Sequence, residues 1–243
     1  MVGASSGIGR AVALQAGAAG ARVACAARRA ERVQEAAAEA GNGAVALVCD
    51  VRIAEHCESV VAQTVGVFGG LDALVFATAV DPLARLADCE QQLWHDVLST
   101  NVIGASLVCR AAVPYLAAAG GKAVFVSASS VGRPLPGMGV YETSKAALEE
   151  MVRAWRGEHP EVGFSTVAVG QTLGTEVYAS WDRELLGEFG GVWARRGYTH
   201  DNGPGAMSVN EAASTVVVAL TSPVDLRYVL ALPAPGSTME VGE

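Results

Sequence analysis

The chain has 243 residues, 51% of them hydrophobic, and its formal net charge at pH 7 is −8. This length suits one α/β domain, and the hydrophobic fraction supplies ample material for a core. The acidic balance and the lack of a basic block exclude sequence-independent nucleic-acid binding, which needs a positively charged footprint. We find no signal peptide and no apolar run long enough to span a membrane, so we expect a cytoplasmic protein without a membrane partner.

Cysteine and histidine usage gives no sign of a metal centre. The five cysteines are widely spaced without a CxxC pair, and the four histidines form no cluster with the spacing of metal ligands. We therefore predict no metal site and no disulfide framework. Small buried apolar side chains are the interpretation we favour for the cysteines.

Apolar runs alternate with helical stretches along the chain. The predicted strands cover residues 21–27, 43–49, 72–78, 122–128, 163–169 and 227–232. The predicted helices cover residues 7–19, 30–40, 54–69, 90–119, 141–158 and 210–221. This alternation predicts a mostly parallel sheet covered by helices on both faces, within a single domain that spans residues 1–243.

One long segment departs from this alternation. Residues 172–206 carry no clear strand but hold five aromatic residues, which are Tyr178, Trp181, Phe189, Trp193 and Tyr198. Either Trp181, Phe189, Trp193 and Tyr198 form an apolar lid over the nicotinamide, or the aromatic side chains pack two short helices together. Only Arg195 and Arg196 are candidates in this segment for holding a phosphate or a carboxylate. The end of the chain, from about residue 233 to 243, is predicted to be a frayed tail.

The chain opens with "MVGASSGIGR", whose glycines have the spacing GxxxGxG. Glycine permits a tight turn and a close approach of phosphate, and the following helix points its free N–H groups at the anion. The alternative is a strand-to-helix turn that merely needs glycine. The predicted pyrophosphate site comprises Gly3, Ser5, Ser6, Gly7, Ile8 and Gly9.

The end of the predicted strand 21–27 indicates which nucleotide binds. An acidic residue there would bond the 2′-hydroxyl of the adenosine ribose, but the sequence has Ala27 followed by Arg28. A guanidinium suits a 2′-phosphate, so we predict that NADP(H) is preferred over NAD(H). We interpret Arg29 and Arg32 as part of the solvated start of the next helix.

The stretch "VYETSKAAL" places Tyr141 and Lys145 four residues apart, on one face of a helix. An ammonium group beside a phenol lowers the pKa of the phenol by stabilising the phenolate. With a nicotinamide nearby, Tyr141 would pass a proton to or from a carbonyl or alcohol oxygen. This pair predicts acid/base chemistry coupled to hydride transfer.

Together these motifs resemble the short-chain dehydrogenase/reductase family, in the family's order and over nearly the whole chain. The resemblance implies a Rossmann-type three-layer α/β sandwich. It gives Tyr141 the acid/base role and Lys145 a second role in holding the nicotinamide ribose. Asn101, in "LSTNVIG", would hold a water that completes a proton relay. The resemblance also implies a homodimer or homotetramer formed through the helices near 90–119 and 141–158.

The resemblance extends the cofactor site beyond the glycine turn, with some departures. The stretch Phe76–Ala79 reads "FATA" where the family has "NNAG", so the bracing asparagines are gone. Val169 replaces a proline, whereas Gly170 keeps the close approach to nicotinamide. Thr172 or Thr175 is expected to hydrogen-bond the carboxamide or the phosphates. The cofactor-binding residues added in this way are Asp50, Val51, Ala77, Gly170 and Thr172.

The family's catalytic serine lies thirteen residues before the tyrosine, where this chain has Ala128. If the intervening loop is one residue shorter than usual, Ser129 takes that role. Otherwise the role is empty, which would slow the enzyme without making it inert. Ser127 is predicted to lie in the strand and to point away.

The first strand of the fold is nearly absent, because only Met1 and Val2 precede the glycine turn. This strand is central in the family, and its large buried side chains would contribute about 6–12 kcal/mol. We therefore expect either that natural residues precede Met1 or that the phosphate-loop half of the fold is compromised.

The sequence predicts an NADP(H)-dependent oxidoreductase that interconverts a carbonyl and an alcohol on a small, hydrophobic substrate. The alternative is a catalytically weakened or N-terminally truncated relative that binds nucleotide or a partner without efficient turnover.

Overall fold

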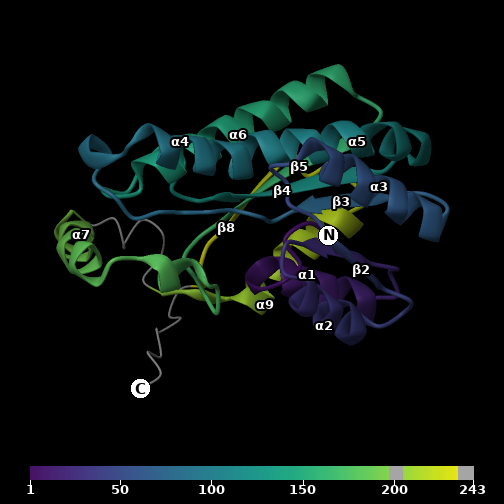
Figure 1. Ribbon diagram of the computed structural model, residues 1–243, viewed down its shortest axis with the longest axis horizontal. Helices are drawn as coiled ribbons and strands as arrows, with labels where there is room; N and C mark the ends of the chain where they lie inside the picture. Colours follow the sequence, from purple (N-terminus) through teal and green to yellow (C-terminus); the bar gives the residue numbers. More distant parts are fainter. Residues whose placement is uncertain (197–204, 235–243) are drawn as a thin grey trace.

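A computed structural model describes residues 1–196 and 205–234 (Figure 1). The strands of its main sheet are β1 (Ala24–Ala27), β2 (Val45–Val48), β3 (Ala73–Phe76), β4 (Lys122–Ala128), β5 (Gly163–Val169) and β8 (Tyr228–Ala231). Their order across the sheet is β2, β1, β3, β4, β5, β8, with Met1–Val2 between β1 and β3, and every pair is parallel. This is the strand order of a doubly wound nucleotide-binding fold, as predicted.

The first strand is reduced to Met1–Val2, which lies at the centre of the sheet. Val2 pairs in parallel with both Ala26 and Phe76. The N–H of Ala77 donates to the carbonyl oxygen of Val2 over 2.9 Å, and the N–H of Ala26 donates to that of Met1 over 2.9 Å. The backbone groups of both neighbouring strands therefore have partners at the level of the glycine turn.

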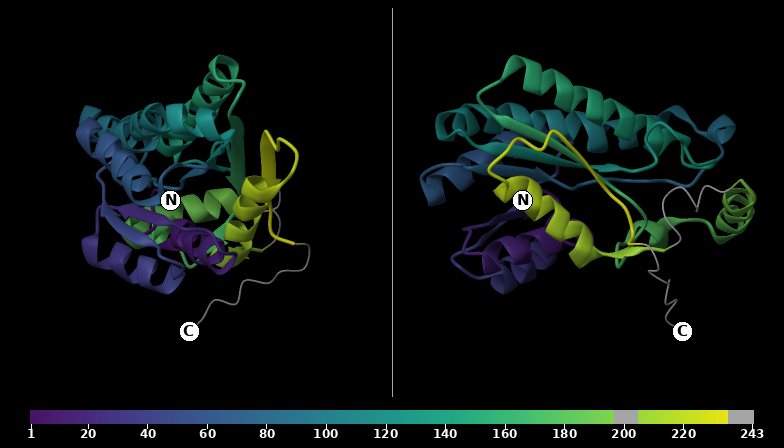
Figure 2. Two further views of the ribbon diagram at one scale, coloured as in Figure 1. Left: turned by 90° about the vertical axis from the view of Figure 1, so that its right-hand side faces the viewer. Right: turned by 180° about the vertical axis from the view of Figure 1, so that it is seen from behind.

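Helices cover both faces of the sheet (Figures 1 and 2). The helices of one layer are α1 (Gly7–Ala18), α2 (Ala30–Ala40) and α9 (Val209–Thr221). The helices of the other layer are α3 (Ala54–Phe68), α4 (Gln91–Leu98), α5 (Gly104–Ala119) and α6 (Gly139–Glu158). Alternate residues of β4 serve the two cores, because Phe125 packs in the layer of α5 and Val124 in the layer of α9.

The predicted helix at 90–119 is divided by a π-helical turn, Ser99–Ile103, between α4 and α5. The prediction of no strand in residues 172–206 is also wrong, because β6 (Thr172–Leu173) pairs with β7 (Met207–Ser208). The same segment contains the 3₁₀ turn η3 (Val177–Ser180) and α7 (Arg183–Arg195), which projects from the sheet at the same end as α4 (Figure 1). A further 3₁₀ turn, η1 (Leu86–Asp88), precedes α4.

The helical stretch Gln91–Ala119 is 29 residues long and contains an 18-residue window with a mean hydropathy of 1.6, so by length and composition alone it is able to cross a membrane. Our prediction that no segment has these properties is wrong on this measure. The apolar side chains of Val108, Cys109 and Leu116 are buried in the core beneath this stretch. Its apolar character is therefore that of a helix packed against a sheet.

Candidate active site

A cleft of about 920 Å³ lies at the carboxyl ends of the parallel strands, where doubly wound folds bind their ligands. It brings together most of the predicted site residues. Those that line it are Gly3, Ser5, Ser6, Gly7, Ile8, Arg28, Asp50, Val51, Ala77, Ser129, Tyr141, Lys145, Gly170 and Thr172. Gly9 and Asn101 are not among the residues of its wall.

The glycine turn is formed at the start of α1. Gly3 has a φ of +93° and Gly7 one of +54°, a region that glycine enters without strain. A Cβ on Gly3 would lie 2.9 Å from the carbonyl carbon of Ala77, and a Cβ on Gly9 would overlap the Gly3 carbonyl oxygen. The side chain of Ser6 does not cap α1, and the first turn carries no acidic residue. The leading N–H groups of α1 are therefore available to an anion.

Two arginines follow β1. Arg28 is exposed and lines the cleft. Arg29 turns back to the glycine turn, where its Nη2 donates to Ser5 Oγ over 2.9 Å and to Ser6 Oγ over 2.8 Å. Its Nη1 lies 2.8 Å from a carboxylate oxygen of Glu176. The interpretation of Arg29 as only the solvated start of a helix is wrong, because its long side chain reaches across to the turn and to the segment after β6.

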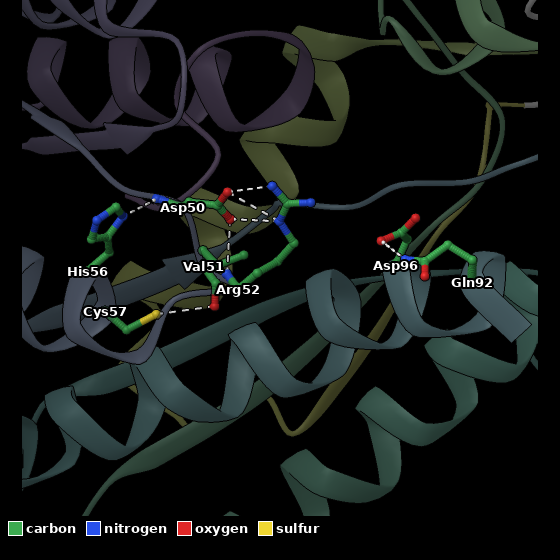
Figure 3. A network of polar contacts seen from close by, with 7 residues as sticks. All are labelled: Asp50, Val51, Arg52, His56, Cys57, Gln92 and Asp96. Carbon is green, nitrogen blue, oxygen red and sulfur yellow. Dashed lines mark hydrogen bonds and ion pairs between the residues drawn. The ribbon is translucent and has the colours of Figure 1, made fainter.

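The part of the cleft formed by the predicted cofactor-binding residues Asp50 and Val51 contains an ion pair (Figure 3). Arg52 donates to both carboxylate oxygens of Asp50, with Nε–Oδ1 at 3.0 Å and Nη2–Oδ2 at 2.6 Å, and this lowers the pKa of Asp50 to about 2. The Sγ of Cys57 donates to the carbonyl oxygen of Val51 over 3.3 Å. A Cβ on Gly104 would lie 2.7 Å from the side chain of Val51, so α5 packs directly against this wall.

Asn101 stands in the π-helical turn and is fully buried. Its Oδ1 accepts the N–H of Val80, and its Nδ2 donates to the Val80 carbonyl and to Ser144 Oγ, all over 2.9 Å. Asn101 thus ties the segment after β3 to α6. Widened π turns are frequent at functional positions.

Tyr141 and Lys145 lie one turn apart on α6. Lys145 is buried, and its Nζ donates to the carbonyl oxygen of Val126 over 2.8 Å and lies 5.7 Å from the centre of the Tyr141 ring. Burial lowers the pKa of Lys145 to about 8, against the opposing effect of nearby carboxylates. Burial, followed by the charges of Asp81 and Glu142, raises the pKa of Tyr141 well above its usual value. The prediction of a lowered phenol pKa is therefore wrong for the protein alone.

Two acidic residues near this pair were missed by the sequence reasoning. Asp81 lines the cleft, and burial raises its pKa to about 7. Glu142 is only 4% exposed, and burial raises its pKa to about 6. Ser130 lies near enough to favour the ionised form of Glu142, but within the described residues no hydrogen bond reaches either carboxylate oxygen. A charged residue directly after the tyrosine, on the face of Lys145, was the signal available for Glu142.

The serines at the end of β4 differ in their hydrogen bonds. The Oγ of Ser127 donates to Glu149 Oε1 over 2.8 Å, so this hydroxyl is used within the core. Ser129 is half-buried and lines the cleft, and its N–H donates to the Val169 carbonyl over 2.9 Å. Replacement of the expected serine at Ala128 by Ser129 stays a prediction.

The nicotinamide side of the predicted site is held by short local bonds. The N–H of Gly170 donates to the Ala231 carbonyl over 2.8 Å, which joins the end of β5 to β8. Thr172 Oγ1 donates to the Gly170 carbonyl over 2.9 Å, and Thr175 Oγ1 donates to the Thr172 carbonyl over 3.4 Å. Both threonines line the cleft.

Two aromatic side chains of the predicted lid, Trp181 and Trp193, line the cleft, and so does Tyr178. The other two predicted members of the lid are Phe189 and Tyr198. Phe189 is buried against Gly137, where a Cβ would lie 2.5 Å from its ring, so the lid prediction is wrong for Phe189. Tyr198 lies outside the described residues, as does the predicted tail beyond residue 234.

Arg195 and Arg196 are exposed and absent from the wall of the cleft, so the prediction that they are candidate anion-binding residues of the site is wrong. Their position at the far end of α7 explains this.

Residues 1–185 match the family model described as short chain dehydrogenase. The chain belongs to the short-chain dehydrogenase family. It is 36% identical over 176 residues to 11-beta-hydroxysteroid dehydrogenase A of Sesamum indicum, a match that covers 70% of this chain and 51% of that protein. It is 33% identical over 157 residues to dehydrogenase/reductase SDR family member 2, mitochondrial, of Homo sapiens, covering 63% and 56%. The chain thus spans about half the length of the curated relatives it matches.

Solved structures share the fold of this chain. The alcohol dehydrogenase of the archaeon Thermococcus sibiricus, complexed with 5-hydroxy-NADP, superposes with a TM-score of 0.81 at 24% identity. The match covers 96% of this chain and 94% of that chain. It shows that the two proteins share the same Rossmann-type fold over nearly their whole lengths.

Proposed function

We propose that this chain is an NADP(H)-dependent oxidoreductase that interconverts a carbonyl and an alcohol on a small, mainly hydrophobic substrate. The observation that carries the proposal is that Tyr141 and Lys145 line the same cleft as the glycine turn at the start of α1. The names of its relatives, a hydroxysteroid dehydrogenase and an alcohol dehydrogenase complexed with an NADP derivative, support this chemistry.

The residues present fit a dinucleotide. A turn that leaves no room for a Cβ at Gly3, followed by uncapped N–H groups of α1, suits the pyrophosphate. Arg28 and Arg29 would hold the 2′-phosphate, and no acid stands at Ala27 to favour a free ribose hydroxyl. Lys145 would hold the nicotinamide ribose. The bound cofactor would supply or accept the hydride.

Tyr141 would exchange the proton with the substrate oxygen. Its raised pKa keeps the phenol protonated at neutral pH, which is the form that donates a proton during carbonyl reduction. Asn101 holds the segment after β3 in place beside α6. Tyr178, Trp181 and Trp193 give the cleft an aromatic wall that would help to exclude water from the reacting oxygen. Oligomerisation through α5 and α6 and a cytoplasmic location stay predictions.

The test is reduction of a panel of apolar ketones by the purified chain, followed by the loss of NADPH absorbance. Tyr141→Phe is expected to lower turnover by about a hundredfold or more, because the proton donor is removed. Tyr115→Phe, at an exposed tyrosine on α5, is the matched control and should retain activity. Equal turnover by Tyr141→Phe and the unmodified protein would refute the proposal.

A nucleotide-binding protein without efficient turnover is the second candidate, favoured by Ala128 at the position of the expected serine. The same preparation separates the two. Stabilisation against heat by NADPH, with no turnover of any ketone in the panel, would support this second function.

A further inference from the structure

The carboxylate of Asp81 stands alone in the apolar part of the cleft. Asp81 lies five residues after the end of β3, is half-buried and lines the cleft beside Leu83 and Trp181. Among the described residues, no other residue donates a hydrogen bond to this carboxylate or forms an ion pair with it. The backbone of Asp81 itself favours the ionised form, but a half-buried carboxylate without a donor or cation from another residue is costly. A ligand that supplies this partner gains affinity.

The backbone around Asp81 is fixed from both sides. Asn101 bonds the N–H and the carbonyl of Val80, and the indole N–H of Trp181 donates to the carbonyl of Asp81 over 2.7 Å. The carboxylate is therefore held on an ordered segment, as a recognition group must be.

The groups that face Asp81 do not neutralise it. Lys145 is the cation whose charge reaches Asp81, but its ammonium is bonded to the carbonyl of Val126. Tyr141 and Tyr178 both have pKa values that the charge of Asp81 raises, so the carboxylate lies close to the proposed acid/base.

The other acids that line the cleft each have a donor. Asp50 is paired with Arg52 and Glu176 with Arg29, while Asp96 accepts a hydrogen bond of 3.1 Å from Gln92. These donors come from residues of the protein itself.

Aromatic rings form the wall next to Asp81. Tyr178 meets Trp181 edge to face with ring centres 4.9 Å apart, and Trp181 meets Trp193 in the same manner at 6.1 Å. Both indole N–H groups are bonded to backbone carbonyls, that of Trp193 to Pro136 over 2.9 Å. The two indoles thus offer π faces and no free N–H donor. π faces beside a carboxylate attract an alkylammonium group.

We propose that the substrate of this cleft carries a protonated amine near its reacting carbonyl or hydroxyl, and that Asp81 holds this ammonium group. The inference rests on the proposed function, because it takes the reacting oxygen to lie at Tyr141. It narrows the hydrophobic substrate to an apolar amino ketone or amino alcohol. A neutral ligand of the same shape leaves Asp81 unpaired and binds more weakly.

The test compares two alcohols of equal shape. One is a phenyl carbinol with a dimethylammonium group on a two-carbon arm, and the other has an isopropyl group in place of the dimethylammonium. Each is titrated calorimetrically into the protein with NADPH present, a pair that cannot react, at about pH 8, where Asp81 is ionised and the amine is still protonated. We expect the ammonium compound to bind about tenfold more tightly or better.

Two variants locate the source of this preference. Asp81→Asn is expected to reduce the affinity ratio to within about twofold of unity. Asp96→Asn removes the same charge from the same cleft and should keep the preference. Equal affinities in the unmodified protein, a preference that survives Asp81→Asn, or an equal loss in both variants would overturn the proposal.

The corresponding ketones separate this inference from the proposed function. Turnover of the neutral ketone without any preference for the amine would refute the role of Asp81 and leave the oxidoreductase function standing. An Asp81-dependent binding preference without turnover of either ketone would support the amine site and refute the proposed function.

Discussion

Replacing Glu142 by glutamine is expected to stabilise this protein at neutral pH. The side chain is 4% exposed, and both carboxylate oxygens lack hydrogen-bond partners among the described residues. Burial raises the pKa of Glu142 from 4.5 to about 6, and at roughly 1.36 kcal/mol per pH unit this difference costs about 2 kcal/mol of folding free energy once the carboxyl is ionised. Glutamine has nearly the same shape and carries no charge, so it avoids this cost.

The effect of Glu142→Gln on the free energy of unfolding should depend on pH. Because the pKa in the folded protein lies above that of the unfolded chain, Glu142 is harmless below about pH 4.5 and becomes unfavourable as the pH rises to about 6. The difference in unfolding free energy between the variant and the unmodified protein should open in this window. At neutral pH it should correspond to a rise in melting temperature of several degrees.

Urea unfolding followed by circular dichroism at about pH 4.5 and about pH 7.5 measures both values. Glu149→Gln is the matched control, because Glu149 is equally buried on the same helix but accepts the hydroxyl of Ser127. That variant should lose stability. A Glu142→Gln protein that is less stable at neutral pH, or whose gain is equal at both pH values, would show that the carboxylate is compensated after all.

Two further variants test the phosphate end of the cleft. Gly9→Ala should cost about 1–3 kcal/mol of stability and most of the NADPH affinity, because the added Cβ overlaps the Gly3 carbonyl oxygen. Gly66→Ala is the control: its Cβ would lie in open space in α3, so this variant should be neutral or stabilising. Thermal melts measure the stability of both variants, and fluorescence titration measures their NADPH affinity. Glu176→Gln releases Arg29 from an exposed ion pair that is worth up to about 1 kcal/mol. NADPH should therefore bind up to about fivefold more tightly. Weaker binding would contradict the idea that the Glu176 carboxylate and the 2′-phosphate of NADPH compete for Arg29.

The sheet and its helices follow from the sequence because buried parallel strands read as continuous apolar runs. Predicted strands 122–128 and 163–169 have the observed bounds of β4 and β5, which both have a neighbouring strand on either side. The division of the helix at 90–119 was not predictable in this way. Gly104 follows the π turn, but a single glycine does not predict one. The turn forms where Asn101 bonds to Val80 and Ser144, both more than 20 residues away in sequence.

The site shows the same limit. Motifs with local spacing, such as the glycine turn and the pair Tyr141–Lys145, were found because their residues meet on one turn or one helix face. The side chain of Arg29 donates to Ser5, which lies 24 residues away in sequence. The charge of Asp81, in the segment after β3, raises the pKa of Tyr141 on α6. Interactions between residues so far apart in sequence depend on strand register and on the conformation of loops, and the sequence carries no periodic signal for either.

The charges around Tyr141 also change what the lysine four residues later does. In the protein alone the pKa of the phenol rises well above its usual value and that of Lys145 falls to about 8, so the two pKa values move apart. Lys145 then loses its proton at a lower pH than Tyr141, and no phenolate–ammonium pair forms. The ammonium group of Lys145 donates its hydrogen bond to the carbonyl of Val126 and not to Tyr141, and Asp81 and Glu142 add negative charge nearby. In the protein alone, the phenol of Tyr141 therefore stays protonated. It follows that any lowering of the phenol pKa must come with ligands that bring positive charge into the cleft or neutralise Asp81.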